Sequence, residues 1–214
     1  MPNANFTEVT HVNSRHLSID YKFIKNGFDM RAAAYRKKTA YIESDNEIMG
    51  AELFLAHQNE QFNFSVSLAH IDSKNITNEG MRYPNQHDFK YYIKAIGKYK
   101  ISPLIELSAI YQHREGSYYL PVLASNYHPP TASYIPIYAE LDQGNRLPDY
   151  HLLDVSINYI HALGNGSMIY FLSASNFLNK ENKAGIAYDS AYNKSGYNTF
   201  NQRVIFFGLV YNWE

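Results

Sequence analysis

The chain contains side chains capable of acid–base, nucleophilic and metal chemistry, but their spacing gives no active-site pattern. It has nine histidines and no cysteine, so disulfides and thiolate metal sites are excluded. No His-x-x-x-His or His-x-His pair brings two imidazoles together. Ser117 and Ser125 lack a nucleophile-elbow context, and structural roles explain His151 and Asp154 better than catalysis does. We therefore expect no enzyme activity, no cofactor and no metal site.

Tyrosine and proline are concentrated in residues 115–149, which makes this stretch the best candidate for ligand binding. Tyrosine rings offer a large contact area at low entropic cost. The five prolines of the stretch limit the freedom that a loop loses on binding. A loop that only packs on its neighbours is an equal alternative. Residues 178–202 form a second, weaker candidate. The candidate residues are Tyr118, Tyr119, Tyr127, His128, Tyr134, Tyr138 and, in the second stretch, Tyr192.

Nine segments that alternate apolar and polar residues must position these stretches. In "HLSIDYKF", Leu17 and Ile19 share one face and Ser18 and Asp20 share the other. A period of two indicates β-strand, whereas helical spacing would place Asp154 on the apolar stripe of "LLDVSINYIH". The segments are 16–23, 28–37, 48–57, 62–70, 89–99, 105–112, 152–159, 167–177 and 203–214.

Short and long connections alternate between these segments. The short ones read "KNG", "QNEQ", "KISP" and "ALGNG", and the long ones are 38–47, 73–86, 115–149 and 178–202. Outer-membrane barrels have this layout, with short periplasmic turns and longer extracellular loops. We predict an all-β fold, an antiparallel up-and-down transmembrane β-barrel to which the chain contributes about nine strands.

A soluble β-sandwich is the competing fold, because its strands also alternate. A sandwich gives no reason for connections to be short at one end every time, and a 35-residue loop is unusual in a compact soluble domain. A net charge of −1 and the lack of a Lys/Arg-rich run argue against nucleic acid as a partner. No apolar run approaches the about 18 residues of a transmembrane helix.

The odd number of segments predicts part of a larger barrel. The first segment leads into a short turn and the last follows a long loop, so both would run toward the periplasm. Single-chain bacterial barrels have an even number of strands, and a tenth strand near "FTEVTHV" (residues 6–12) would change the count. The start, "MPNANFTEVTHVNSRH", also lacks the basic and apolar regions of a signal peptide.

Four stretches, by their order and spacing, resemble the C-terminal barrel region of TonB-dependent outer-membrane receptors. The strongest is "NRLPDYHLLDVSINY" (145–159), which is similar to the family's Arg-Leu-Pro-x-Tyr-x-x-Leu-Asp stretch before a late strand. In "ASNFLNKEN" (174–182), Phe177 and Leu178 stand in the reverse of the family's order. The others are "EIMGAELFLA" (47–56) and "YPNQHDF" (83–89). The resemblance implies a receptor that binds a scarce nutrient, such as a siderophore or a glycan, and imports it.

The resemblance also implies a location and partners. Residues 1–214 would be the C-terminal portion of the barrel, without the plug domain, in the outer membrane of a diderm (Gram-negative) bacterium. Outer-membrane lipid, the plug domain, the remaining strands and the barrel-assembly machinery would be partners, and the TonB complex would act through a missing N-terminal part. Polar strand faces would line the lumen against the plug. The lumen-facing residues are Asp20, Lys22, Glu52, Lys90, Lys94, Lys98, Glu106 and Asp154.

The terminal segment "RVIFFGLVYNWE" resembles the signal that the barrel-assembly machinery recognises. Gly208, Tyr211 and Trp213 match its register, whereas Phe206 stands where a polar residue is expected and Glu214 adds one residue. The two late aromatic rings would lie at the periplasmic membrane interface, where such rings are favoured. A terminal strand of a soluble sheet remains the alternative, and with it a soluble or surface all-β module that binds glycans or peptides. A small self-contained barrel would need an even number of strands.

Overall fold

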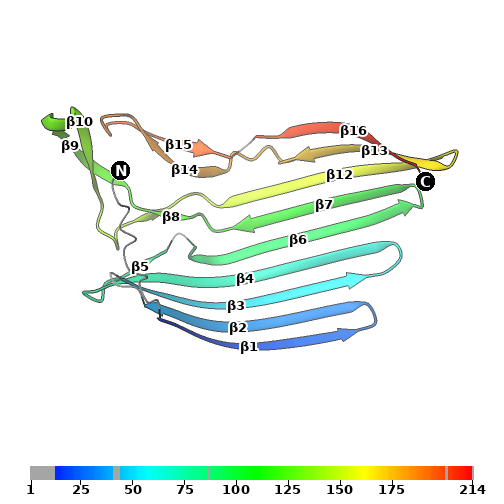
Figure 1. The fold of residues 1–214 in the computed structure, drawn as a ribbon, viewed down its shortest axis with the longest axis horizontal. Coiled ribbons are helices and arrows are strands. Elements are labelled where there is room, and N and C mark those ends of the chain that lie inside the picture. The colour runs from blue at the N-terminus through cyan, green and yellow to red at the C-terminus, as the bar shows by residue number, and fades with distance from the viewer. Residues whose placement is uncertain (1–12, 41–43, 86, 201, 214) are drawn as a thin grey trace, which may run out of the picture.

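A computed structural model describes residues 13–40, 44–85, 87–200 and 202–213. Its main feature is one antiparallel sheet whose nine long strands follow one another in chain order (Figure 1). The three-residue β5 (Arg82–Pro84) adds to the outer part of β4. The nine strands are β1 (Asn13–Lys25), β2 (Phe28–Ala40), β3 (Ser44–Gln58), β4 (Phe62–Thr77), β6 (Phe89–Ser102), β7 (Ile105–Arg114), β12 (Tyr150–Leu163), β13 (Gly166–Ser175) and β16 (Val204–Trp213).

The up-and-down sheet confirms the predicted nine strands and their order. In the described part of the chain, β1 and β16 are the two edges of the sheet, which is therefore open. The segment 6–12, where a tenth strand was considered, lies outside the described residues. Barrels need closed edges in a membrane because unpaired backbone groups are costly there, so the open edges agree with a partial barrel.

Tight turns join the strands at one end of the sheet. Asn26 and Gly27 both have positive φ, 50° and 78°, as a two-residue hairpin turn with right-handed strand twist requires. A Cβ on Gly27 would also lie 2.7 Å from the carbonyl oxygen of Gln58. Gly164, with φ 59°, likewise supplies a positive φ in the tight turn between β12 and β13. The four short connections are confirmed.

The opposite, loop end of the sheet differs from the prediction in two ways. The predicted long connection 38–47 is wrong, because β2 continues to Ala40 and β3 begins at Ser44. The stretches 115–149 and 178–202 are also not irregular, and Figure 1 shows their small hairpins beyond the long strands. These are β8 (Tyr118–Tyr119) with β11 (Asn145–Arg146), β9 (Val122–His128) with β10 (Ser133–Tyr138) around the 3-10 turn η1 (Pro129–Thr131), and β14 (Lys183–Tyr188) with β15 (Ser195–Thr199).

The strand register gives the sheet one apolar and one polar face. Directly paired residues of neighbouring strands lie on the same face, and a row of bulky apolar residues crosses five strands in register. All the predicted lumen-facing residues lie on the other face. The apolar row is Tyr99, Leu107, Ile157, Leu172 and Phe207, and the adjacent polar row is Lys98, Ser108, Ser156 and Ser173.

The apolar face has no second layer over it. Among the described residues, only Ala139 and Leu147 are buried apolar side chains, and both belong to 115–149. Leu17, Phe207 and Trp213 keep 70%, 87% and 78% of their surface exposed. A sandwich would bury these faces between two sheets, so the sandwich alternative is wrong for this part of the chain. No helix among the described residues is long and apolar enough to cross a membrane.

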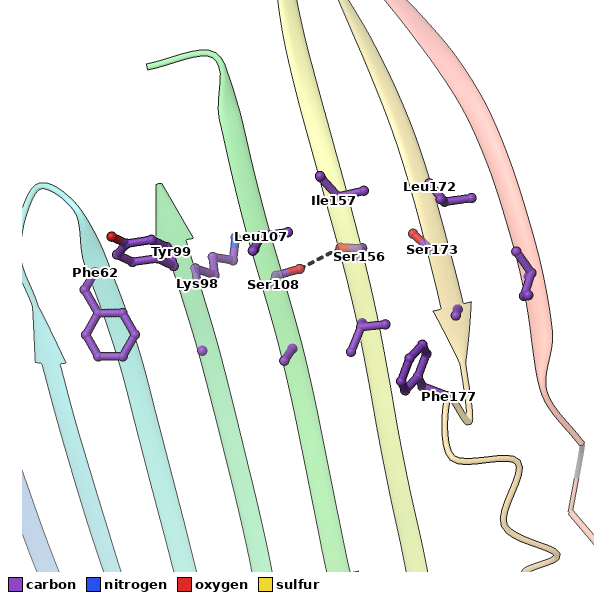
Figure 2. A pocket seen from close by; sticks show the side chains of 15 residues that line it. Phe62, Lys98, Tyr99, Leu107, Ser108, Ser156, Ile157, Leu172, Ser173 and Phe177 are labelled. Atoms are coloured by element: carbon purple, nitrogen blue, oxygen red, sulfur yellow. Dashed lines mark hydrogen bonds between the residues drawn. The ribbon is translucent and has the colours of Figure 1, made fainter. Parts of the chain in front are cut away.

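A hollow of about 580 Å³ lies on this uncovered face. It follows the register row Gly97, Ala109, Val155 and Ala174, whose side chains are smaller than those of the adjacent bulky row. Figure 2 shows Tyr99, Leu107, Ile157 and Leu172 along one side and Phe177 on the other. Because its walls are apolar, the hollow suits hydrocarbon rather than a polar ligand.

Candidate functional site

The candidate binding site is a cleft at the loop end of the sheet. It has a volume of about 490 Å³, and its walls come from two segments far apart in the sequence. One wall belongs to the β4–β6 connection and the other to 115–149. Four tyrosines and two asparagines give it aromatic surface and amide hydrogen-bonding groups. The lining residues are Asn75, Tyr83, Pro84, Asn85, Tyr118, Tyr119, Leu120 and Tyr138.

An ionic cluster around Arg146 joins the two walls. The Arg146 guanidinium pairs with the carboxylate of Asp88 and donates to the Asp88 carbonyl at 2.7 Å. It also lies 3.2 Å from a carboxylate oxygen of Glu115. Asp88, which is 5% exposed, accepts a further bond from the Ser73 amide at 2.9 Å. Planar guanidinium groups suit such several-partner clusters, so Arg146 fixes 115–149 against the β4–β6 connection.

The residues after Arg146 complete the stem of the long loop. The Leu147 amide donates to the Ser117 carbonyl at 3.0 Å, and its side chain is 6% exposed. Gly116 lies against this backbone so closely that a Cβ would stand 1.6 Å from the Leu147 carbonyl oxygen. Asp149 accepts the Tyr91 hydroxyl at 2.5 Å. The stem therefore holds the cleft through backbone packing as well as through charge.

Two predicted binding residues, Tyr118 and Tyr119, line the cleft, and the Tyr118 hydroxyl is held by hydrogen bonds within its own loop. The Tyr118 hydroxyl donates to the Leu141 carbonyl at 2.6 Å and accepts the Gly144 amide at 2.9 Å. A Cβ on Gly144 would stand 2.2 Å from the Tyr118 ring, so this ring supports its own loop. Burial raises the pKa of the Tyr119 phenol above its ordinary value, which moves its ionisation further from neutral pH.

The remaining predicted binding residues divide between the cleft and the hairpins above it. Tyr138 lines the cleft and is 55% exposed. Tyr127 and Tyr134 face each other across β9 and β10, with ring centres 5.2 Å apart, and His128 contacts Thr131. None of these three lines the cleft.

Tyr192 belongs to the neighbouring loop 178–202, where its ring lies 5.8 Å from that of Tyr188. The Tyr188 hydroxyl accepts the Val122 amide at 3.0 Å, and Ser125 donates to the Ala191 carbonyl at 2.6 Å. The two long loops therefore pack on one another, as the packing alternative proposed. Ligand binding by any of the tyrosines stays a prediction.

The polar-face carboxylates predicted for the lumen have structural partners within the sheet. Glu52 accepts the Tyr35 hydroxyl at 3.1 Å, and Glu106 lies 4.0 Å from the Lys98 ammonium. Asp154 accepts Ser175 Oγ at 3.0 Å and the Asn176 amide at 2.8 Å. Asp154 therefore fixes the exit of β13 against β12.

The final strand carries the residues of the predicted assembly signal. Gly208 lies under the Phe171 ring, where a Cβ would stand 2.5 Å from it. The rings of Tyr211 and Trp213 lie 6.0 Å apart on the apolar face at the turn end. Glu214 lies outside the described residues. Recognition by the assembly machinery stays a prediction.

Sequence reasoning missed the second wall of the cleft and a cluster of His113, Asp149 and His151. Tyr83 and Asn85 lie within "YPNQHDF", which was noted only as the start of a strand. His113 and His151 are far apart in the sequence and meet only because β7 and β12 pair. No local spacing could have shown either arrangement.

Solved structures match this fold, although no protein-family model and no curated protein does. The ferripyoverdine receptor of the outer membrane of Pseudomonas aeruginosa, bound to ferripyoverdine, matches with a TM-score of 0.60 and 11% identity. The siderophore receptor PiuA from Acinetobacter baumannii matches with a TM-score of 0.59 and 15% identity. The chain has the fold of part of an outer-membrane receptor barrel.

The matches cover almost all of this chain but only part of each receptor. They include 92% and 94% of this chain, and 26% and 28% of the two receptor chains. The chain therefore spans about a quarter of the length of each receptor. The resemblance that the four motifs indicate is confirmed at the level of the fold, and both neighbours are receptors rather than enzymes.

Proposed function

We propose that this chain is part of a TonB-dependent outer-membrane receptor that binds a scarce nutrient at its loop end and imports it. The observation that carries the proposal is the open up-and-down sheet with a fully uncovered apolar face. Only hydrocarbon satisfies such a face without a second protein layer. The loop end also has a cleft and two loops that pack on one another, which together could form the outer ligand-binding surface of a receptor.

Each uncovered surface of the sheet has a proposed partner. Outer-membrane lipid covers the apolar face, and the remaining barrel strands pair with the edges β1 and β16. A plug domain packs against the polar face, where Glu52, Glu106 and Asp154 lie. The TonB complex acts through the part of the receptor that carries the plug. The barrel-assembly machinery recognises the final strand.

The cleft favours a ligand with flat or ring-shaped groups and several hydrogen-bonding atoms. Tyr119 and Tyr138 offer aromatic surface from the loop, and Asn75 and Asn85 offer amides from the opposite wall. The Asn85 amide already donates to the Asn75 side-chain oxygen at 3.1 Å, which orients the pair and leaves part of its hydrogen-bonding capacity for a ligand. Ferric siderophores have this chemistry, and two solved structures that match this fold are siderophore receptors. A glycan is the second ligand class that stacks on tyrosine rings.

Uptake by the complete receptor tests the role of the cleft. We expect the double variant Tyr119→Ala/Tyr138→Ala to bind its ferric siderophore at least about tenfold more weakly, since central aromatic contacts contribute more than about 1 kcal/mol each. The siderophore concentration that gives half-maximal radiolabelled uptake, compared across a panel of siderophores, would measure this change in affinity. Tyr127→Ala/Tyr134→Ala is the matched control, because it removes two tyrosines of the same loop outside the cleft. Equal losses in both variants would contradict the cleft as the site.

Membrane extraction separates the receptor from the alternative of a soluble or surface binding module for glycans or peptides. We expect the protein in the outer-membrane fraction, resistant to urea and released only by detergent. Release into the soluble fraction without detergent would contradict the receptor proposal and favour the binding module.

A further inference from the structure

Two imidazoles and a carboxylate meet at the loop ends of β7 and β12. His113 is the penultimate residue of β7 and pairs in register with His151, the second residue of β12. Their rings stack with centres 4.2 Å apart. Asp149 precedes β12 by one residue, and one ligand atom from each of the three side chains lies within 4.8 Å of the others.

The local hydrogen bonds leave lone pairs available on this cluster. Nδ1 of His113 lies 3.3 Å from the Tyr150 carbonyl oxygen. A carbonyl can only accept a hydrogen bond, so Nδ1 carries the proton and Nε2 carries the lone pair. Metal-bound histidines usually have this arrangement, with one nitrogen bonded to a carbonyl or carboxylate. Asp149 accepts the Tyr91 hydroxyl on one oxygen and, at 3.4 Å, the Gly116 amide on the other. These bonds orient the carboxylate, and each oxygen keeps a further lone pair.

The backbone around His151 is fixed by a neighbouring side chain. Asn182 accepts the His151 amide at 2.8 Å and donates to the His151 carbonyl at 2.6 Å, and it is 3% exposed. This clamp places His151 opposite His113 independently of the imidazole itself. The cluster is half-buried at its histidines and exposed at Asp149, so an ion could reach it from water.

We propose that His113, Asp149 and His151 bind a divalent transition-metal ion of the Zn²⁺ type, leaving open coordination positions for water. Two imidazoles and one carboxylate form a donor set that suits Zn²⁺, Cu²⁺ or Ni²⁺ rather than Mg²⁺ or Ca²⁺. Bonds of about 2.1 Å place tetrahedral ligands about 3.4 Å apart, so the ligand atoms, which lie within 4.8 Å of one another, need to approach by up to about 1.4 Å. Because a metal lies in the plane of each imidazole that binds it, the stacked rings must also turn out of their parallel arrangement. The χ2 torsion of histidine is broad enough to allow this turn.

The surrounding charges both favour and oppose the bound ion. The Asp149 carboxylate supplies negative charge that favours a bound cation. The Lys180 ammonium supplies positive charge near His151 that opposes it. The side chain of Arg114, the last residue of β7, stacks on Phe89 and Tyr150. A bound ion would link the end of β7 to the start of β12 and to the last residue of the long loop. The site does not depend on the proposed import function.

Zn²⁺ titration of the purified full-length protein, stripped with EDTA and kept in detergent if membrane-bound, tests the site. We expect one Zn²⁺ per chain by calorimetry, with affinity lowered at least about tenfold in His113→Gln, His151→Gln and Asp149→Asn. His161→Gln is the matched control, because this histidine also stacks on an aromatic ring but lies at the other end of β12. We expect its Zn²⁺ affinity to equal that of the wild type.

X-ray absorption at the zinc edge of the wild-type protein gives a readout that does not depend on the variants folding. The proposal expects a spectrum with two imidazole ligands and oxygen in the remaining positions. Absence of stoichiometric binding at about 1 mM Zn²⁺, a spectrum without imidazole scattering, or an equal loss in the His161→Gln control would overturn it.

Discussion

The nine long strands, which form the wall of the partial barrel, and the loop end of the sheet are stabilised in different ways. Along the wall, large apolar side chains remain exposed and the strands are joined by their backbone ladder. At the loop end, side chains are buried in polar and ionic contacts. Every buried side chain among the described residues belongs to this end, namely Thr39, Glu47, Ser73, Asp88, Ala139, Leu147, Asn176 and Asn182.

The difference indicates which solvent each region has to satisfy. A wall that lipid covers needs no interior of its own, because the solvent is as apolar as the side chains. In the proposed receptor, the loop end projects into water and must form its own interior, but only two apolar side chains of the described residues, Ala139 and Leu147, are buried there. Hydrogen-bonded charges such as Asp88 and Glu47 replace a hydrophobic core there.

The largest expected effect is removal of Arg146. Arg146→Met leaves the nearly buried Asp88 carboxylate without its cation, and breaking a buried pair costs about 3–5 kcal/mol. We expect a decrease of about 3 kcal/mol in the free energy of unfolding, measured by urea denaturation in detergent micelles. Proteolysis within 115–149 should accelerate, because the stem loses its contact with the β4–β6 connection.

The matched substitution at the turn end is Arg31→Met. Arg31 also pairs with an aspartate, Asp29, but its side chain is 54% exposed. Exposed pairs contribute little, so we expect no measurable change in urea unfolding. Equal destabilisation by the two substitutions would contradict the proposed difference between the loop end and the wall.

Glycine substitutions sharpen the same comparison with a smaller effect. At the loop end, Gly116→Ala forces a Cβ against the Leu147 carbonyl, and overpacking of this kind costs about 1–3 kcal/mol. On the wall, a Cβ at Gly97 meets nothing within 4 Å, so we expect Gly97→Ala to leave unfolding unchanged. Thermal unfolding in micelles would measure both. A larger loss from Gly97→Ala would show that the hollow on the apolar face is occupied.

The smallest effect on stability is expected at the end of the wall. Trp213 is 78% exposed, so Trp213→Ala should change unfolding of the assembled protein by less than about 1 kcal/mol. The amount of protein assembled in the outer membrane should nevertheless fall, if the terminal aromatic residues act as the assembly signal. Quantitative blotting of membrane fractions would measure this. Leu172→Ala, on the same face, is the control that should assemble normally.

The strands and turns of the wall could be predicted because their signals are local. Alternation fixes which face a side chain takes, and Asn26-Gly27 fixes one hairpin through the positive φ of both residues. The long connections were harder to predict. The stretch 38–47 was misassigned because Lys38, Asp45 and Glu47 are polar yet lie within strands, where Lys38 pairs with Asp45 and Glu47 with Arg36. Alternation no longer indicates which face is buried where both faces of a strand contact polar groups.

The motifs could be recognised in the sequence, but their purpose depended on contacts between them. Arg146 of "NRLPDYHLLDVSINY" meets Asp88 of "YPNQHDF", and Asp154 of the same stretch meets Asn176 of "ASNFLNKEN". Read singly, each motif indicated only the start or exit of a strand. The first contact belongs to the stem that holds the cleft, and the second fixes the exit of β13 against β12.

The sequence alone determined the strand class, the apolar face and the tight turns, since these follow from a two-residue period and from backbone preferences of single residues. Only the tertiary structure decided which distant side chains meet. The tyrosine cleft, the Arg146 cluster and the pairing of His113 with His151 all depend on register between strands. Register is a long-range property, because a shift of one residue would move every side chain to the opposite face.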